Sequence, residues 1–96
     1  SDGKYADAAR ILSAELQNFP RSRAALSLLG YCYYYMQDFR NAALTYEQLV
    51  KFHGEEPRYM VYYAQSLYKV REHTPNQPPT QLSSHLSLLI SPLSPL

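Results

Sequence analysis

Apolar residues recur three and four positions apart through most of residues 1–72. In the first such segment they stand at Ala8, Ile11, Leu12 and Leu16, a spacing that places them on one face of an α-helix. The same pattern predicts four helices, over residues 2–20, 23–36, 39–53 and 57–72. The predicted fold class is therefore all-α.

Polar, glycine and proline residues mark the predicted helix ends. Ser22 and Asp38 are suited to accept hydrogen bonds from the first-turn N–H groups of the helices that follow them. Gly54 suits the C′ position of the third helix, where a left-handed backbone is common. Pro57 fits the first turn of the last helix. These signals predict short turns between consecutive helices.

The sequence also resembles itself when it is shifted so that Tyr5 aligns with Phe39. The same shift, which we call the repeat offset, aligns five further pairs: Ala8 with Ala42, Leu12 with Tyr46, Leu26 with Met60, Gly30 with Ala64, and Tyr34 with Tyr68. Its period of 34 is that of the tetratricopeptide repeat, a helix–turn–helix unit that stacks into a solenoid. The sequence therefore resembles a fragment of such a solenoid.

The repeat divides the chain into a helical part, residues 1–72, and a tail, residues 73–96. The helical part reads as the second helix of one repeat (2–20), a complete repeat (23–56) and the first helix of another (57–72). In the complete repeat, Gly30 and Ala42 allow the two helices to approach closely. About three repeats are usually needed for a stable solenoid, so we expect this chain to be marginally stable alone.

The tail differs sharply in composition. All 17 Lys, Arg, Asp and Glu residues stand at or before Glu72, and five of the seven prolines follow it. Such a segment is typical of a disordered tail. Leu82, Leu86 and Leu89 have helical spacing, so a short helix over residues 81–90 is the alternative. The tail is also compatible with a segment foreign to the solenoid.

No pattern in the chain indicates catalysis, a metal or a cofactor. His53, His73 and His85 are far apart, and Cys32 is the single cysteine, so no ligand spacing for a metal exists. A small buried thiol is the favoured interpretation of Cys32, with a reactive thiol as the alternative. The glycines are isolated and form no phosphate-binding loop. We therefore expect no enzyme activity.

Charge and aromatic content narrow the class of partner. The formal net charge is +1, which gives no reason to expect nucleic acid or a membrane surface as a partner. No apolar stretch is long enough to suggest membrane insertion. The chain has ten tyrosines, all between Tyr5 and Tyr68. Such a load of amphipathic rings suits a helical core that also presents a groove.

We expect a protein-binding groove on the first helix of each repeat, opposite the close-packed Gly30 and Ala64. The predicted groove residues are Ser27, Tyr31, Tyr34, Arg58, Val61, Gln65 and Tyr68. For the three tyrosines of this set, groove and core remain equal alternatives, whereas Tyr33 and Tyr63 are expected in the core. An aromatic groove with a few polar groups suits an extended, proline-containing peptide.

Three segments carry a narrower resemblance: residues 22–34, with their Leu-Leu-Gly-Tyr-Cys-Tyr-Tyr run, residues 46–49 (Tyr-Glu-Gln-Leu), and residues 62–69 (Tyr-Tyr-Ala-Gln-Ser-Leu-Tyr-Lys). Together they resemble the N-terminal repeats of the tetratricopeptide-repeat subunit of the intraflagellar transport B complex, the tetratricopeptide repeat protein thirty family. The resemblance covers about residues 1–70. It does not extend into the tail.

This resemblance implies a scaffold role in building cilia, and a location in the cilium or cytoplasm. It implies intraflagellar transport B subunits as partners, because full-length members form a closed superhelix around a proline-rich segment of a core subunit. It also implies a link to polyglutamylation of ciliary tubulin. Two alternatives remain: a generic repeat adaptor with another partner, and a truncated isoform without stable activity.

Overall fold

The computed structural model describes residues 2–73, which form four α-helices and, within that range, no strand. The helices are α1 (Asp2–Asn18), α2 (Arg23–Tyr35), α3 (Phe39–Phe52) and α4 (Pro57–His73). The all-α class predicted from the apolar spacing is therefore confirmed. The tail from residue 74 onward, with the alternative helix over residues 81–90, lies outside the described residues.

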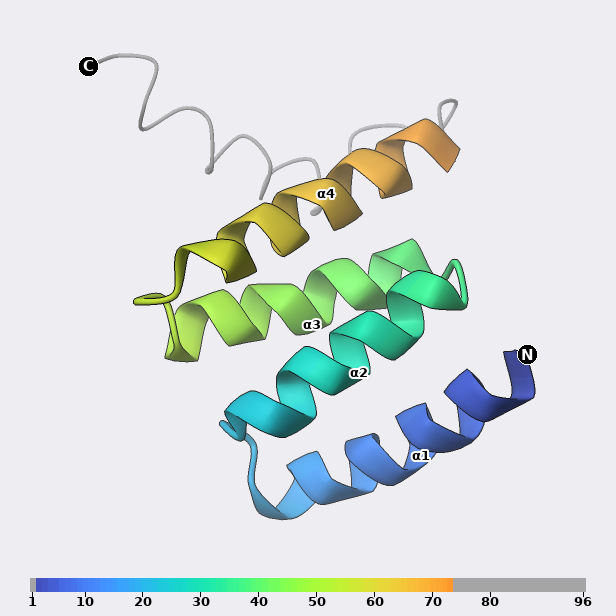
Figure 1. The fold of residues 1–96 in the computed structure, drawn as a ribbon, viewed down its shortest axis with the longest axis vertical. Helices are drawn as coiled ribbons and strands as arrows, with labels where there is room; N and C mark the ends of the chain where they lie inside the picture. The colour runs from blue at the N-terminus through green and yellow to red at the C-terminus, as the bar shows by residue number, and fades with distance from the viewer. Residues whose placement is uncertain (1, 74–96) are drawn as a thin grey trace.

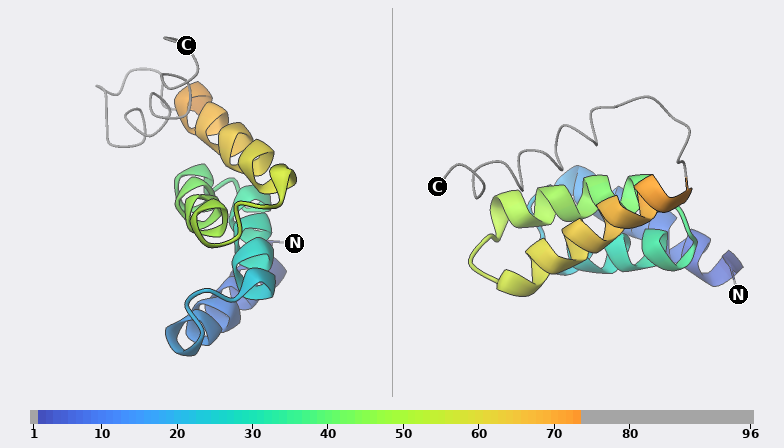
Figure 2. Two further views of the ribbon diagram at one scale, coloured as in Figure 1. Left: turned by 90° about the vertical axis from the view of Figure 1, so that its left-hand side faces the viewer. Right: turned by 90° about the horizontal axis from the view of Figure 1, so that it is seen from above.

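The helices stack in chain order, so that each packs mainly on its neighbours in sequence (Figure 1). In a view with the stack still upright, α3 lies to one side of α2 and α4 (Figure 2, left). This staggered order is the helix–turn–helix repeat expected from the repeat offset. One consequence is that α2 and α4 flank the same side of α3.

The predicted N-caps are present. Ser22 Oγ accepts a hydrogen bond from the Ala25 N–H (3.1 Å), and Asp38 Oδ1 accepts one from the Asn41 N–H (3.3 Å). Each bond satisfies one of the first-turn N–H groups that have no partner within a helix. Pro57 is the first residue of α4, where its missing N–H costs no helical hydrogen bond.

The expected left-handed C′ conformation occurs at a different residue. Gly54 does not have a positive φ, whereas Gln37, after α2, has a φ of 62°. The Gln37 N–H donates to the Tyr34 carbonyl and the Asp38 N–H to the Tyr33 carbonyl. This pair of bonds is a Schellman motif. Gly54 does occupy the C′ position after the C-cap His53, as predicted, but the left-handed backbone is adopted by Gln37 instead.

Gly30 and Gly54 are required for another reason, because neighbouring atoms leave no room for a side chain. A Cβ at Gly54 would lie 2.9 Å from the Val50 carbonyl oxygen, so the backbone itself occupies the room. A Cβ at Gly30 would lie 2.6 Å from Cε1 of Tyr46. The close approach predicted at Gly30 is present, and the group that comes close is the Tyr46 ring.

The core consists of two connected clusters. The smaller one joins α1 to α2 through Ala9, Leu29 and Cys32. The larger one joins α2, α3 and α4, and its buried members are Leu26, Phe39, Ala42, Ala43, Tyr46, Leu49, Tyr59, Tyr63, Leu67 and Val70. Leu16 and Tyr33 pack against both clusters. Burial raises the pKa of the Cys32 thiol, as expected for an inert packing residue.

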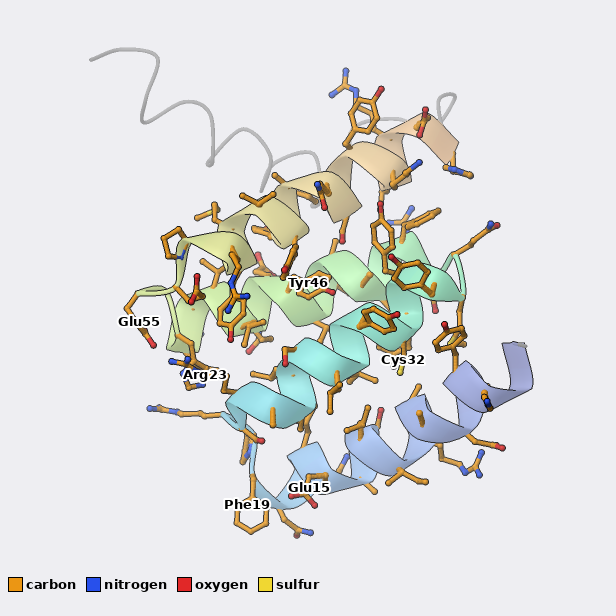
Figure 3. All side chains as sticks on the ribbon, viewed as in Figure 1. Glu15, Phe19, Arg23, Cys32, Tyr46 and Glu55 are labelled. Atoms are coloured by element: carbon orange, nitrogen blue, oxygen red, sulfur yellow. The ribbon has the colours of Figure 1, made fainter. Side chains whose placement is uncertain are left out.

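Two polar contacts join the start of α2 and the turn before it to the turn before α4. Arg23 forms an ion pair with Glu55, and both side chains are labelled in Figure 3. His53 Nε2 donates to the Arg21 carbonyl at 2.6 Å, and since a carbonyl can only accept, Nε2 carries the proton. These contacts link the starts of α2 and α4 at one side of the stack.

Candidate peptide-binding groove

A pocket of about 250 Å³ opens on the side of α3 that α2 and α4 flank. Its lining residues, which we call the tyrosine pocket, are Ser27, Tyr31, Tyr34, Tyr35, Tyr46, Tyr62 and Gln65. Helix α2 contributes the first four, α3 contributes Tyr46, and α4 contributes the last two. In Figure 3 Tyr46 is labelled on α3, between α2 and α4.

The structure brings four of the seven predicted groove residues together. Ser27, Tyr31, Tyr34 and Gln65 all line the tyrosine pocket. They come from two helices that are neighbours in space because α3 is the packing partner of both. Whether this pocket binds a peptide stays a prediction.

The other three predicted residues lie on α4 outside the tyrosine pocket. Arg58 forms an ion pair with Glu56 (3.2 Å) next to the first turn of the helix. Val61 and Tyr68 are exposed. The repeat offset treats α2 and α4 as equivalent, but among the predicted α4 residues only Gln65 lines the tyrosine pocket.

Sequence reasoning missed three lining residues. Tyr46 is buried in the core, and its ring also lines the pocket from α3. Tyr35 stands four residues after Tyr31, and Tyr62 three residues before Gln65. This helical spacing from predicted groove residues is the signal that could have found both.

The rings that line the pocket contact one another in two groups. The centroids of Tyr31 and Tyr35 are 4.5 Å apart, those of Tyr34 and Tyr35 are 5.5 Å apart, and those of Tyr46 and Tyr62 are 5.6 Å apart. Tyr5 of α1 extends the first group, with its ring 6.2 Å from Tyr31 and from Tyr35. Such pairs hold each other in place, which limits the entropy lost when a ligand packs on them.

The tyrosine pocket is uncharged at neutral pH. Burial, reinforced by neighbouring tyrosines, raises the pKa of Tyr46 to about 12. Ser27 Oγ donates to the Ala24 carbonyl at 3.2 Å, which leaves its lone pairs to accept a hydrogen bond. The exposed Gln65 amide offers both a donor and an acceptor. The pocket is therefore suited to a neutral ligand with apolar rings and amide groups.

The described residues show no arrangement for metal chemistry or membrane crossing. Between residues 2 and 73 no three or more His, Cys, Asp or Glu side chains gather as metal ligands. His73 packs its ring on Phe39 with 5.0 Å between centroids, and His85 lies outside the described range. Over the same range, no helix has the length and hydropathy to cross a bilayer.

Fold and pocket together define a helical-repeat protein with a tyrosine-lined pocket. No family model matches the chain. It is similar to intraflagellar transport protein 70A of Danio rerio, with 64% identity over 67 residues, and of Homo sapiens, with 57% identity over 68 residues. Intraflagellar transport protein 70B of Rattus norvegicus is also 57% identical over 68 residues. The resemblance predicted from the sequence is thus confirmed.

The similarity covers only part of each protein. The aligned region is 70% of this chain in the Danio rerio comparison and 71% in the human one. In both comparisons the aligned region is 10% of the relative's length. The chain therefore spans about a tenth of the curated relatives that it matches.

Proposed function

We propose that residues 2–73 form a protein-binding module of an intraflagellar transport scaffold. In this proposal an extended, proline-containing segment of a partner subunit packs in the tyrosine pocket. The observation that carries it is the convergence of five tyrosines from three helices on one uncharged pocket. The names of the relatives support the setting, a transport assembly of the cilium.

The chemistry of the pocket favours proline over a charged segment. Proline rings pack well on aromatic faces, and the extended polyproline conformation is preformed, so little entropy is lost on binding. The carbonyls of such a segment have no internal partners, and the Gln65 amide is placed to donate to one of them. A charged side chain would instead lose its hydration among neutral rings.

The pocket size indicates how much of the segment it holds. Ligand pockets for drug-sized molecules measure about 300–1,000 Å³, and this one measures about 250 Å³. It therefore accommodates a few side chains of a longer segment. The exposed α4 residues Arg58, Val61 and Tyr68, predicted with the groove, are proposed to contact the segment beyond the pocket.

The proposal is tested with the exposed Tyr31. A fluorescein-labelled ten-proline peptide is titrated with the protein, and fluorescence anisotropy reports the affinity. Tyr31→Ala removes one ring face and should weaken binding about tenfold, since aromatic packing contributes roughly 1–1.5 kcal/mol. Tyr31→Phe keeps the ring and should bind like the wild type. The double variant Tyr31→Ala, Tyr34→Ala should abolish binding.

Ile11→Ala is the matched control, because Ile11 is also exposed but lies on α1, away from the pocket. Circular dichroism must show equal helicity for all variants. Unchanged affinity in the Tyr31→Ala variant would contradict the groove assignment. Equal binding of a glycine–serine peptide of the same length would contradict the preference for proline.

We also propose a location and a wider role for the module, on the basis of its similarity to intraflagellar transport proteins. We place the module in the cilium or cytoplasm, with no catalytic step of its own, and with a link to tubulin polyglutamylation through the assembly it joins. Co-purification with transport-train subunits from ciliated cells tests this setting. Capture of the chain by an unrelated complex would favour the generic adaptor, and rapid degradation would favour an isoform without stable activity.

A further inference from the structure

The α1–α2 turn and the α3–α4 turn lie on the same edge of the stack (Figure 1). Phe19, Arg23 and Glu55 are labelled on this edge in Figure 3. In a solenoid, neighbouring repeats stack on the faces of the helices, whereas the turns form the edges. This edge is therefore not an end face of the stack, and a helix stacked on α1 or on α4 would leave it open.

Two cations on this edge share one aromatic ring. The guanidinium carbon of Arg21 lies 4.9 Å from the centroid of the Phe52 ring, and Lys51 Nζ lies 5.7 Å from it. Arg21 and Lys51 are both exposed. Within residues 2–73 neither of them forms an ion pair, and Glu55 of the α3–α4 turn pairs with Arg23 instead. No paired carboxylate in this range therefore offsets the repulsion between the two cations.

Arg21 is held at two points, although it lies in a turn. Its carbonyl accepts the hydrogen bond from His53 Nε2 at 2.6 Å, which ties its backbone to the end of α3. Its guanidinium lies over the Phe52 ring. An exposed arginine loses rotamer freedom when it binds a ligand, and less is lost here because the ring already restricts the side chain. The guanidinium keeps N–H donors that a carboxylate can accept in pairs.

A shallow hollow adjoins Arg21. It measures about 500 Å³ and is lined by Asn18, Phe19, Pro20, Arg21 and Ser22. Phe19 is 59% exposed, and together with Pro20 it supplies the apolar part of the hollow. Arg21 belongs both to the hollow and to the pair of cations. A carboxylate on Arg21 and an apolar side chain in the hollow can therefore come from neighbouring residues of one segment.

We propose that this surface, which we call the cationic edge and define as Phe19, Pro20, Arg21, Lys51 and Phe52, binds an acidic segment of a partner protein. One carboxylate of the segment accepts from Arg21, another accepts from Lys51, and an apolar side chain packs on Phe19. Charge complementarity carries the proposal, because both cations lack a carboxylate partner within residues 2–73. The cationic edge shares no residue with the tyrosine pocket, so it does not rest on the proposed function.

Fluorescence anisotropy of a fluorescein-labelled Glu-Glu-Phe-Glu-Glu peptide, titrated with the full 96-residue chain, tests the proposal. Arg21→Gln and Lys51→Gln should each weaken binding about tenfold, because each removes a charge-assisted contact. The double variant should abolish binding. Arg21→Lys keeps the charge but loses the planar guanidinium, so it should weaken binding about threefold. Raising the salt concentration from about 50 mM to about 500 mM should weaken the wild type as well.

Arg71→Gln is the matched control. It removes one positive charge from an exposed position in the last turn of α4, at the end of that helix away from the cationic edge (Figure 1), and should bind like the wild type. A Ser-Ser-Phe-Ser-Ser peptide with the same label should not bind. The double variant Arg21→Gln, Lys51→Gln should bind the ten-proline peptide like the wild type, so this proposal and the proposed function can fail independently. Circular dichroism checks that each variant is folded.

Four outcomes would overturn the proposal. The first is a wild-type chain that leaves the acidic peptide free at about 1 mM protein. The second is unchanged affinity in both Arg21→Gln and Lys51→Gln, as expected if Lys51 only interacts with the negative end of the α3 dipole. The third is equal weakening by Arg71→Gln, which would assign binding to net charge. The fourth is equal binding of the Ser-Ser-Phe-Ser-Ser peptide, which would assign it to the phenylalanine alone.

Discussion

At the scale of single residues, Gly30 couples the core of this protein to its candidate groove. The Tyr46 ring lies where a Cβ of residue 30 would stand. That ring is buried in the larger core cluster and at the same time lines the tyrosine pocket. A change at residue 30 must therefore affect stability and pocket shape together.

Gly30→Ala should destabilise the protein and disturb the pocket. The added methyl group overlaps three atoms of the Tyr46 ring, and overpacking of this kind costs about 1–3 kcal/mol. Urea denaturation measures the loss, and proline-peptide binding should weaken in parallel. The double variant Gly30→Ala, Tyr46→Leu removes the overlap and should recover part of the stability. No change in stability on Gly30→Ala alone would contradict the close contact.

Because the phenols of Tyr46 and Tyr63 are buried, the free energy of unfolding is expected to fall at alkaline pH. Burial raises the pKa of Tyr46 to about 12, and burial together with Glu47 raises the pKa of Tyr63, whose hydroxyl donates to Glu47 Oε2 at 3.1 Å. Since folding favours the neutral phenols, their contribution to stability is complete below the ordinary phenol pKa of 10.0. It falls as the pH rises toward about 12.

Urea midpoints followed by circular dichroism between about pH 9 and about pH 12 measure this loss. The decline should be shallower in Tyr46→Phe, which lacks one of the two titrating hydroxyls. An equal decline in both proteins would assign the effect to other groups. Stability that rises with pH over this range would contradict the expected sign.

At the scale of elements, the end of α2 stores strain in one residue. Gln37 has a φ of 62° in the turn to α3, a conformation that costs an L-residue roughly 1–2 kcal/mol. Glycine avoids this cost but loses more freedom on folding. The Schellman hydrogen bonds made by Gln37 and Asp38 hold the turn in place despite the strain.

Gln37→Gly should therefore stabilise the protein by about 0.5–1 kcal/mol, the difference between the two effects. For a chain of this size the thermal midpoint should rise by a few degrees. Gln37→Ala is the control, because alanine keeps the strain and should give no gain. A midpoint that falls on Gln37→Gly would indicate that the glutamine side chain itself stabilises the turn.

At the scale of the whole molecule, the helices form a stack with two different end faces. Helices α2 and α3 are covered on both sides, whereas within residues 2–73 α1 and α4 each pack mainly on one helix. Repeat proteins gain stability from such neighbour contacts, so residues 2–73 are expected to be only marginally stable by themselves.

Much of this architecture is readable in the sequence because its signals are local. The caps at Ser22 and Asp38 and the proline at Pro57 act within one turn of their helix. Apolar spacing is likewise a property of a single helix. The pairs aligned at the repeat offset then predicted the repeat, and Gly30 with Ala42 predicted the close approach of α2 and α3.

Other positions could not be read from the sequence in this way. Gln37 is not a residue type that favours a left-handed backbone, whereas Gly54 is such a type but has no positive φ and stands beside the Val50 carbonyl. Both positions depend on the geometry of their turns, which residue type alone does not fix. Tyr46 belongs to core and pocket at once because α2, α3 and α4 meet around it, and spacing along one helix cannot show this.

The sequence by itself therefore determined the all-α class, the four helices, the repeat and the resemblance to intraflagellar transport proteins. The tertiary structure decided which of the predicted groove residues share a pocket. Ser27, Tyr31, Tyr34 and Gln65 meet because α3 supports α2 and α4 side by side, whereas Tyr68 lies on a face with no such neighbour among residues 2–73. Periodicity places a residue on a face of its helix, but only packing between helices determines what that face meets.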